Sequence, residues 1–133
     1  MTRRWLLAGL GACAFAADPP VSIRGKLVRT TDGPAIEMPD GRRVRLAGDG
    51  PTMEVVNDKR LEGADFEANG QFVSSAVFRV EPIHKRNMFV HKDGHRLQIS
   101  YWCGVCSIRT WSPGVCMCCQ DETQLDLKER FDP

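Results

Sequence analysis

Apolar and polar residues alternate along much of this chain, and such alternation is typical of strands with one buried and one exposed face. The alternating segments cover residues 21–28, 35–38, 43–46, 66–72 and 77–81. Asp40-Gly41 joins the second segment to the third, and this dipeptide favours a tight hairpin turn. The pattern therefore predicts five strands between residues 21 and 81.

A short helix is predicted between the third and fourth strands. Thr52 is its candidate cap, the helix covers Met53 to Leu61, and Gly63 ends it. This order of elements, from Val21 to about Ile83, resembles that of the OB fold, a five-stranded Greek-key barrel. The resemblance implies a mainly β fold class, with a small OB-like barrel and one short helix. An SH3-like barrel and a plain meander are the alternatives.

A second hairpin follows the predicted barrel and leads into a cysteine-rich segment. Asp93-Gly94 separates two strand-like segments, 88–91 and 95–99. The alternation continues past the second segment, so Tyr101 and Cys103 are expected on its apolar face. The first cysteine of the segment therefore lies at the end of a strand.

The first residues have the features of an export signal. Arg3 and Arg4 precede an apolar run, and Ala14-Phe15-Ala16 fits the small-residue pattern of a cleavage site. The apolar run is shorter than the roughly 20 residues that a membrane-spanning helix needs. A periplasmic or secreted protein is therefore expected. Cys13 lies in a lipobox-like sequence, so a lipoprotein anchored to the membrane through Cys13 is the alternative.

These segments divide the chain into three parts: a signal peptide over 1–16, an OB-like barrel over 21–83, and a hairpin with a cysteine-rich module and a tail over 84–133. The tail, Gln120 to Phe131, is charged and is predicted to be helical. The composition, with 42% hydrophobic and 26% charged residues, is that of an ordinary globular protein. The net charge of +1 gives no basis for electrostatic capture of nucleic acid.

Five of the six cysteines lie in the module, as two pairs with equal spacing and one extra thiol. A C-x-x-C turn supplies two thiolates from one loop, and two such turns supply the four ligands of tetrahedral zinc. The predicted metal ligands are Cys103, Cys106, Cys116 and Cys119, in a zinc-ribbon-like site of four thiolates. The nine residues between the pairs are fewer than the roughly 15–20 usual for that pattern. Cys118 is the additional thiol.

The sequence is also compatible with other cysteine chemistry. An exported protein meets an oxidising environment, so two structural disulfides with one free thiol are an alternative. Copper(I) favours thiolate and thioether, and the Cys116–Cys119 segment is dense in both. The Cys103–Cys106 pair is a candidate dithiol redox site. An iron–sulfur cluster is less expected, because neither ferredoxin spacing is present.

The side chains near the cysteine cluster are expected to support the metal site rather than to catalyse a reaction. Three histidines bracket the second hairpin and are candidate substitutes for a thiolate ligand: His84, His91 and His95. The aromatic residues Tyr101, Trp102 and Trp111 are expected to shield the cluster from water. Acidic residues form no paired arrangement suited to acid–base catalysis, and phosphate-binding glycine loops are absent.

The pattern from Tyr101 to Gln120, Tyr-Trp-Cys-x-x-Cys-x-Ile-Arg-Thr followed by Pro-Gly-x-Cys-x-Cys-Cys-Gln, resembles that of small exported bacterial proteins of uncharacterised function. The resemblance covers about Met88 to Leu127 and implies export and a dedicated cysteine module. The leading hypothesis is a non-enzymatic exported protein with a structural zinc site. It would act by binding an envelope protein or a small ligand. The alternatives are a thiol redox or copper-handling protein and a disulfide-stapled interaction module.

Overall fold

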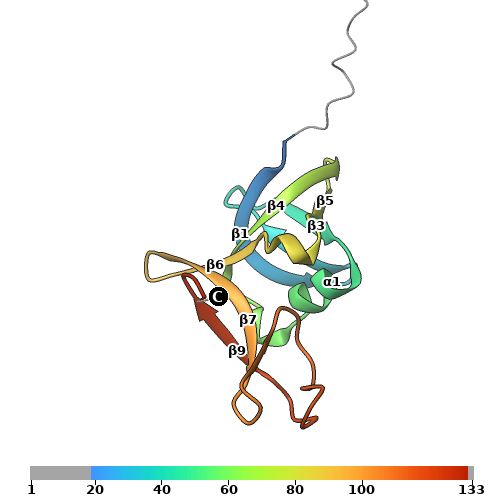
Figure 1. The fold of residues 1–133 in the computed structure, drawn as a ribbon. Helices are drawn as coiled ribbons and strands as arrows, with labels where there is room; N and C mark the ends of the chain where they lie inside the picture. The colour runs from blue at the N-terminus through green and yellow to red at the C-terminus, as the bar shows by residue number, and fades with distance from the viewer. Residues whose placement is uncertain (1–18, 132–133) are drawn as a thin grey trace, which may run out of the picture.

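A computed structural model of the chain describes residues 19–131. The predicted signal peptide over 1–16 and Cys13 lie outside the described residues. The structure is mainly β, with the five-stranded barrel in the first half and additional strands in the second (Figure 1). No helix of the described part is long and apolar enough to cross a membrane.

Five strands close the barrel, in the order β1-β2-β3-β5-β4 and back to β1. Their bounds are β1 Val21–Thr30, β2 Gly33–Glu37, β3 Arg43–Ala47, β4 Asp65–Ser74 and β5 Val77–Val80. All neighbouring pairs are antiparallel except β3 and β5, which run parallel. The strand order and the position of the helix between β3 and β4 agree with the OB-like barrel predicted from the sequence.

Two glycines allow the strands to coil tightly enough to close. A Cβ on Gly25 of β1 would collide with the carbonyl oxygen of Glu37, and one on Gly70 of β4 would collide with that of Arg79. Glycine is favoured where strands bend or backbones approach closely in this way. The barrel therefore depends on the absence of a side chain at these two positions.

The short helix α1, Gly50–Val56, begins earlier than predicted and ends earlier. Asp49, not Thr52, is its cap: the Asp49 carboxylate accepts a hydrogen bond from the Thr52 backbone N–H at 2.9 Å. Leu61 belongs instead to the separate 3-10 turn η2, Lys59–Leu61. Asp58 begins this turn and breaks the helical pattern that the sequence suggested, because its side chain caps Arg60 N–H.

The second half continues the same sheet. One edge of β4 pairs with two strands in succession. Near Gly70 this edge pairs with β5, and at residues 65–68 it pairs with β6. The elements that follow β5 are η3 Ile83–Lys85, β6 Met88–Lys92 and β7 His95–Cys103. Asp93 and Gly94 both have positive φ, 53° and 81°, so the predicted hairpin turn between β6 and β7 is confirmed.

Strand β7 is the centre of the cysteine module. One of its edges pairs with β6 and then with β8, Ile108–Thr110, and its other edge pairs with β9, Gln124–Lys128. The prediction of a helical tail was wrong, because Gln124-Leu125-Asp126-Leu127-Lys128 alternates with a period of two and pairs with the open edge of β7.

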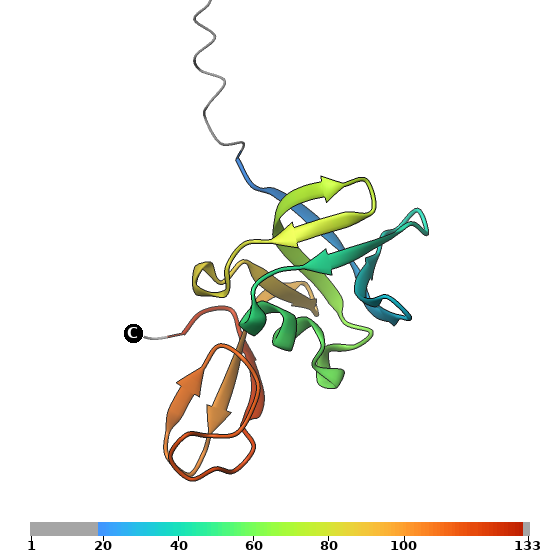
Figure 2. The same cartoon turned by 90° about the vertical axis from the view of Figure 1, so that its right-hand side faces the viewer.

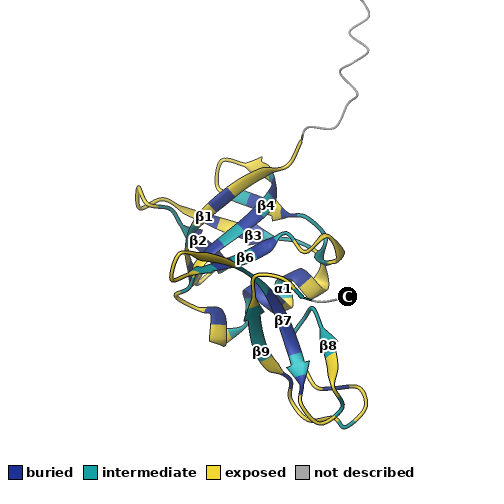
Figure 3. Cartoon of the chain, turned by 60° about the vertical axis from the view of Figure 1, so that its left-hand side comes forward, coloured by how far each residue is buried: buried dark blue, intermediate teal, exposed yellow. Residues whose placement is uncertain are grey.

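A single hydrophobic core runs through the barrel and into the base of the module. Ile99 and Tyr101 of β7 belong to the same buried cluster as Phe66 and Phe78 of the barrel, and Leu125 of β9 packs against it. The tip of the module, with its cysteine loops, extends beyond this core (Figure 2, Figure 3). The cysteine loops consequently need a source of stability other than apolar burial.

Candidate metal centre

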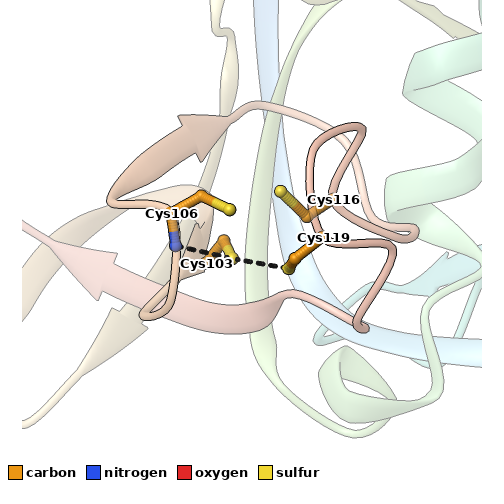
Figure 4. Close-up of side chains that lie close together, drawn as sticks. All are labelled: Cys103, Cys106, Cys116 and Cys119. Carbon is orange, nitrogen blue, oxygen red and sulfur yellow. Dashed lines mark hydrogen bonds between the residues drawn. The ribbon is translucent and has the colours of Figure 1, made fainter.

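Two loops at the tip of the module bring four sulfur atoms together. Cys103 ends β7 and Cys106 lies in the turn that leads to β8, while Cys116 and Cys119 lie in the loop between β8 and β9. Figure 4 shows the four side chains pointing toward one another from the two loops. All four sulfur atoms lie within 4.8 Å of one another. These are the same four cysteines that the sequence predicts as metal ligands.

The spacing of the sulfur atoms suits a tetrahedral ion. With Zn–S bonds near 2.3 Å, the edge of a tetrathiolate tetrahedron is about 3.8 Å. The Sγ atoms of Cys103 and Cys119, which come from different loops, are 3.5 Å apart. A framework of two disulfides would separate the sulfurs into two pairs, whereas here all four converge on one point. The described cysteines, Cys103 to Cys119, are all free thiols.

The two C-x-x-C turns have the same local structure. In each turn, the backbone N–H of the residue after the second cysteine donates to the carbonyl of the first cysteine: Ser107 to Cys103, and Gln120 to Cys116, both at 2.8 Å. Ser107 and Gln120 are both left-handed, with φ of 54° and 64°. Two equivalent turns therefore face each other and bring the four cysteines together.

Backbone N–H groups in the turns are directed at the sulfur atoms. Cys106 N–H donates to Cys103 Sγ, and Cys118 N–H donates to Cys116 Sγ, both at 3.4 Å. Hydrogen bonds from the backbone of Cys119 and of Cys118 lower the pKa of the Cys116 thiol to about 7. Because the thiolate is the form that binds a metal, these N–H groups prepare the second turn for coordination.

Cys118 is outside this set of four. Its side chain is exposed, whereas Cys103 and Cys116 are buried and Cys106 and Cys119 are half-buried. The neighbouring Met117 is 94% exposed. The structure therefore separates the additional thiol from the four convergent ones, although all five are close in sequence.

The histidines take no part in the described cysteine cluster. His91 contacts Glu67 at 2.7 Å and His95 contacts Glu129, both by ring nitrogens, and His84 is exposed.

Tyr101 does not shield the cluster as predicted. Its ring is fully buried in the shared core and its hydroxyl is directed toward the barrel.

A polar network connects the barrel to the cysteine loops. The Tyr101 hydroxyl donates to the Asp58 carboxylate at 2.9 Å, and the same carboxylate holds Arg60 in an ion pair at 3.0 Å. Arg60 in turn donates to the Thr123 carbonyl at 3.0 Å. Thr123 donates through its backbone and its hydroxyl to Gly114, in the loop that carries the second cysteine pair. The network therefore fixes the base of that loop relative to the barrel.

The charge on Asp58 is stabilised within this network. Burial raises the pKa of Asp58, but hydrogen bonds from the Arg60 side chain and backbone and from Tyr101 together lower it below its ordinary value. Burial and the hydrogen bond to Asp58 raise the pKa of Tyr101, so the phenol stays protonated and acts as the donor. The network thus contains an ionised, half-buried carboxylate that accepts hydrogen bonds from Arg60 and Tyr101.

We expect Tyr101→Phe to lower the free energy of unfolding by about 1–3 kcal/mol, because a half-buried carboxylate loses a donor. Chemical denaturation of Tyr101→Phe, Asp58→Asn and the double variant measures the coupling between the two groups. A coupling energy of at least about 1 kcal/mol is expected for partners in one network. Additive effects of the two single substitutions would show that the hydrogen bond does not contribute.

Aromatic and arginine side chains hold the other side of the module. Arg109 of β8 donates to Ser100 Oγ at 2.7 Å and to Asp126 at 2.8 Å, which connects β7, β8 and β9. The Arg109 guanidinium also lies 4.9 Å from the Trp102 ring and 4.3 Å from the Phe131 ring. These contacts fix β8, which leads away from the first cysteine pair.

Trp111 anchors the long loop to the barrel side. The Arg86 guanidinium lies 3.8 Å from the centre of the Trp111 ring, and Phe131 packs edge-on against the same ring with centroids 5.3 Å apart. Trp111 therefore packs against the segment that follows η3 and against the C-terminal segment.

The residues that position the loops were not predicted from the sequence. Asp58, Arg60, Arg109 and Thr123 are far from one another in sequence, and their residue types are common on protein surfaces. The left-handed Ser107 and Gln120 also carry no sequence signal, since glycine or asparagine is the usual residue at such positions.

A comparison of the chain with protein-family models, with curated proteins and with solved structures gives no match. The site is thus described by its own geometry: four clustered cysteines that could hold a metal ion.

Proposed function

We propose that this chain is an exported protein whose cysteine module binds one structural zinc ion through Cys103, Cys106, Cys116 and Cys119. The observation that carries this proposal is the convergence of four sulfur atoms within 4.8 Å, from two equivalent turns. Zinc is the ion that most often occupies a closed tetrathiolate site in proteins. Iron–sulfur chemistry is disfavoured by the cysteine spacing.

The proposed zinc is structural rather than catalytic. Catalytic zinc keeps an open position for water or substrate, whereas four thiolates complete the tetrahedron. The loops that carry the ligands extend beyond the hydrophobic core, so an ion that crosslinks them would supply the missing stability. We therefore propose that the protein acts by binding, and that the metal holds the module in a shape suited to a partner.

We further propose a cellular location and a binding partner for the protein. The export pattern at residues 3–16 and the resemblance of the tail to small exported bacterial proteins support a periplasmic or secreted protein, with lipidation at Cys13 as the alternative. The OB-fold assignment of the barrel is supported by its strand order. An envelope protein or a small ligand is the proposed partner.

Metal analysis of the purified chain tests the proposal. We expect one zinc per chain and, after unfolding in the presence of a chelator, five titratable thiols from the module. Two disulfides without metal would contradict the zinc site and favour a disulfide-stapled module.

A copper-handling or thiol redox role is the second candidate, because Cys118 and Met117 place an exposed thiol and an exposed thioether beside the cluster. The same metal analysis distinguishes it. Bound copper that is lost in Cys118→Ser would favour this role over structural zinc.

A further inference from the structure

Cys118 is the one thiol of the module that is exposed and unused by the four-sulfur cluster. We propose that Cys118 is an oxidation site that controls metal occupancy: a peroxide oxidises its thiol, and a disulfide to Cys106 then removes one of the four ligands. This inference rests on the proposed metal centre and adds a mode of regulation to it.

Accessibility favours Cys118 as the first sulfur to react. Oxidants attack accessible thiols, whereas buried or metal-bound sulfurs are protected. Among the five cysteines of the module, Cys118 is the exposed one, and Cys103 and Cys116 are buried. Its backbone N–H donates to Cys116 Sγ at 3.4 Å, which holds the Cys118 backbone beside the cluster.

Geometry selects Cys106 as the partner. The Cα atoms of Cys118 and Cys119 are neighbours across a trans peptide, about 3.8 Å apart, which is below the roughly 4.4–6.8 Å usual for a disulfide. Cys106 belongs to the facing turn and is half-buried. The other two ligands, Cys103 and Cys116, are buried, so Cys106 is the accessible partner.

The chemistry balances with a peroxide as the oxidant. The Cys118 sulfur attacks one oxygen of hydrogen peroxide, the O–O bond breaks, and a sulfenic acid and water form. The Cys106 thiolate then attacks the Cys118 sulfur, the S–S bond forms, and hydroxide leaves and takes up a proton to become water. Two sulfurs lose two electrons in total, and the peroxide gains them. The ion is left with three thiolates and dissociates more readily.

The test is zinc release from the zinc-loaded full chain after addition of hydrogen peroxide, followed with a chromogenic chelator. Peptide mapping without reductant identifies the disulfide. We expect zinc release together with a Cys106–Cys118 crosslink, and release at least about tenfold slower in Cys118→Ser, whose zinc content before oxidation is unchanged. Met117→Leu is the matched control, because peroxide also oxidises the adjacent exposed thioether; it should release zinc at the wild-type rate.

The outcomes separate this inference from the proposed metal site. Equal release rates in wild type and Cys118→Ser, or a crosslink that joins cysteines other than Cys106 and Cys118, would overturn the oxidation site and leave the zinc site intact. A slow release in Met117→Leu that matches Cys118→Ser would also overturn it. A wild-type chain that binds no zinc before oxidation would contradict the metal site itself.

Discussion

Zinc removal is expected to unfold the two cysteine loops, residues 103–107 and 114–121, and to leave β8 and the barrel folded. The loops lie outside the shared hydrophobic core, and the contact between the Cys103 and Cys119 sulfur atoms connects the two turns that carry the ligands. Metal-binding energy is folding energy for such small sites. Strands β6 and β7 should stay folded, because β6 pairs with β4 and because Ile99 and Tyr101 are buried in the core.

Hydrogen exchange followed by mass spectrometry, with and without a chelator, measures this difference. Amide protection in the loops should fall to nearly that of an unfolded chain, with little change in β1 to β5. Cys103→Ser should resemble the chelated protein, and Cys118→Ser, which alters a neighbouring thiol of the same loops, should resemble the zinc-bound protein. Unchanged protection of the loops after zinc removal would show that the metal does not hold them.

Gly70→Ala is expected to destabilise the barrel by about 3 kcal/mol, at the upper end of the range for overpacking. The added Cβ would collide with the carbonyl of Arg79 and lie 2.9 Å from the Cα of Val80, so backbone rather than a flexible side chain would have to move. For a domain of this size, the melting temperature should fall by about 10 °C. Thermal unfolding followed by circular dichroism measures the change.

Gly50→Ala is the matched control for this substitution. Gly50 begins α1 and has no atom within 4 Å of an added Cβ, so alanine should change stability by at most about 0.5 kcal/mol. Zinc content should be the same in both variants, since neither glycine lies near the cysteine loops. A Gly70→Ala protein as stable as Gly50→Ala would contradict the close approach of β4 and β5.

The fold was largely predictable because its strands carry local signals. Alternation placed all five barrel strands, and the two Asp-Gly pairs marked two hairpins. The tail was mispredicted because a helical spacing of Leu125, Lys128 and Phe131 competes with the alternation from Gln124 to Lys128. The unpaired edge of β7 decides between them, and that edge exists only in the folded chain.

The cysteine cluster was predictable for a similar reason. The C-x-x-C spacing indicates which thiols share a turn. The pairs Cys103–Cys106 and Cys116–Cys119 can therefore be predicted from the sequence. No local sequence pattern identifies the residues that hold the turns in place. Asp58 reaches Tyr101 across 43 positions, and Arg60 reaches Thr123 across 63, and no local pattern connects such pairs. Their contribution becomes visible only when the barrel brings η2 against β7.

X-ray absorption at the zinc edge on the zinc-loaded chain identifies the atoms bound to the ion. We expect four sulfur neighbours at about 2.3 Å in the wild-type protein, and three sulfurs with one lighter neighbour in Cys103→Ser. A first shell of nitrogen or oxygen in the wild-type protein, or an unchanged shell in Cys103→Ser, would contradict a metal centre built from Cys103, Cys106, Cys116 and Cys119.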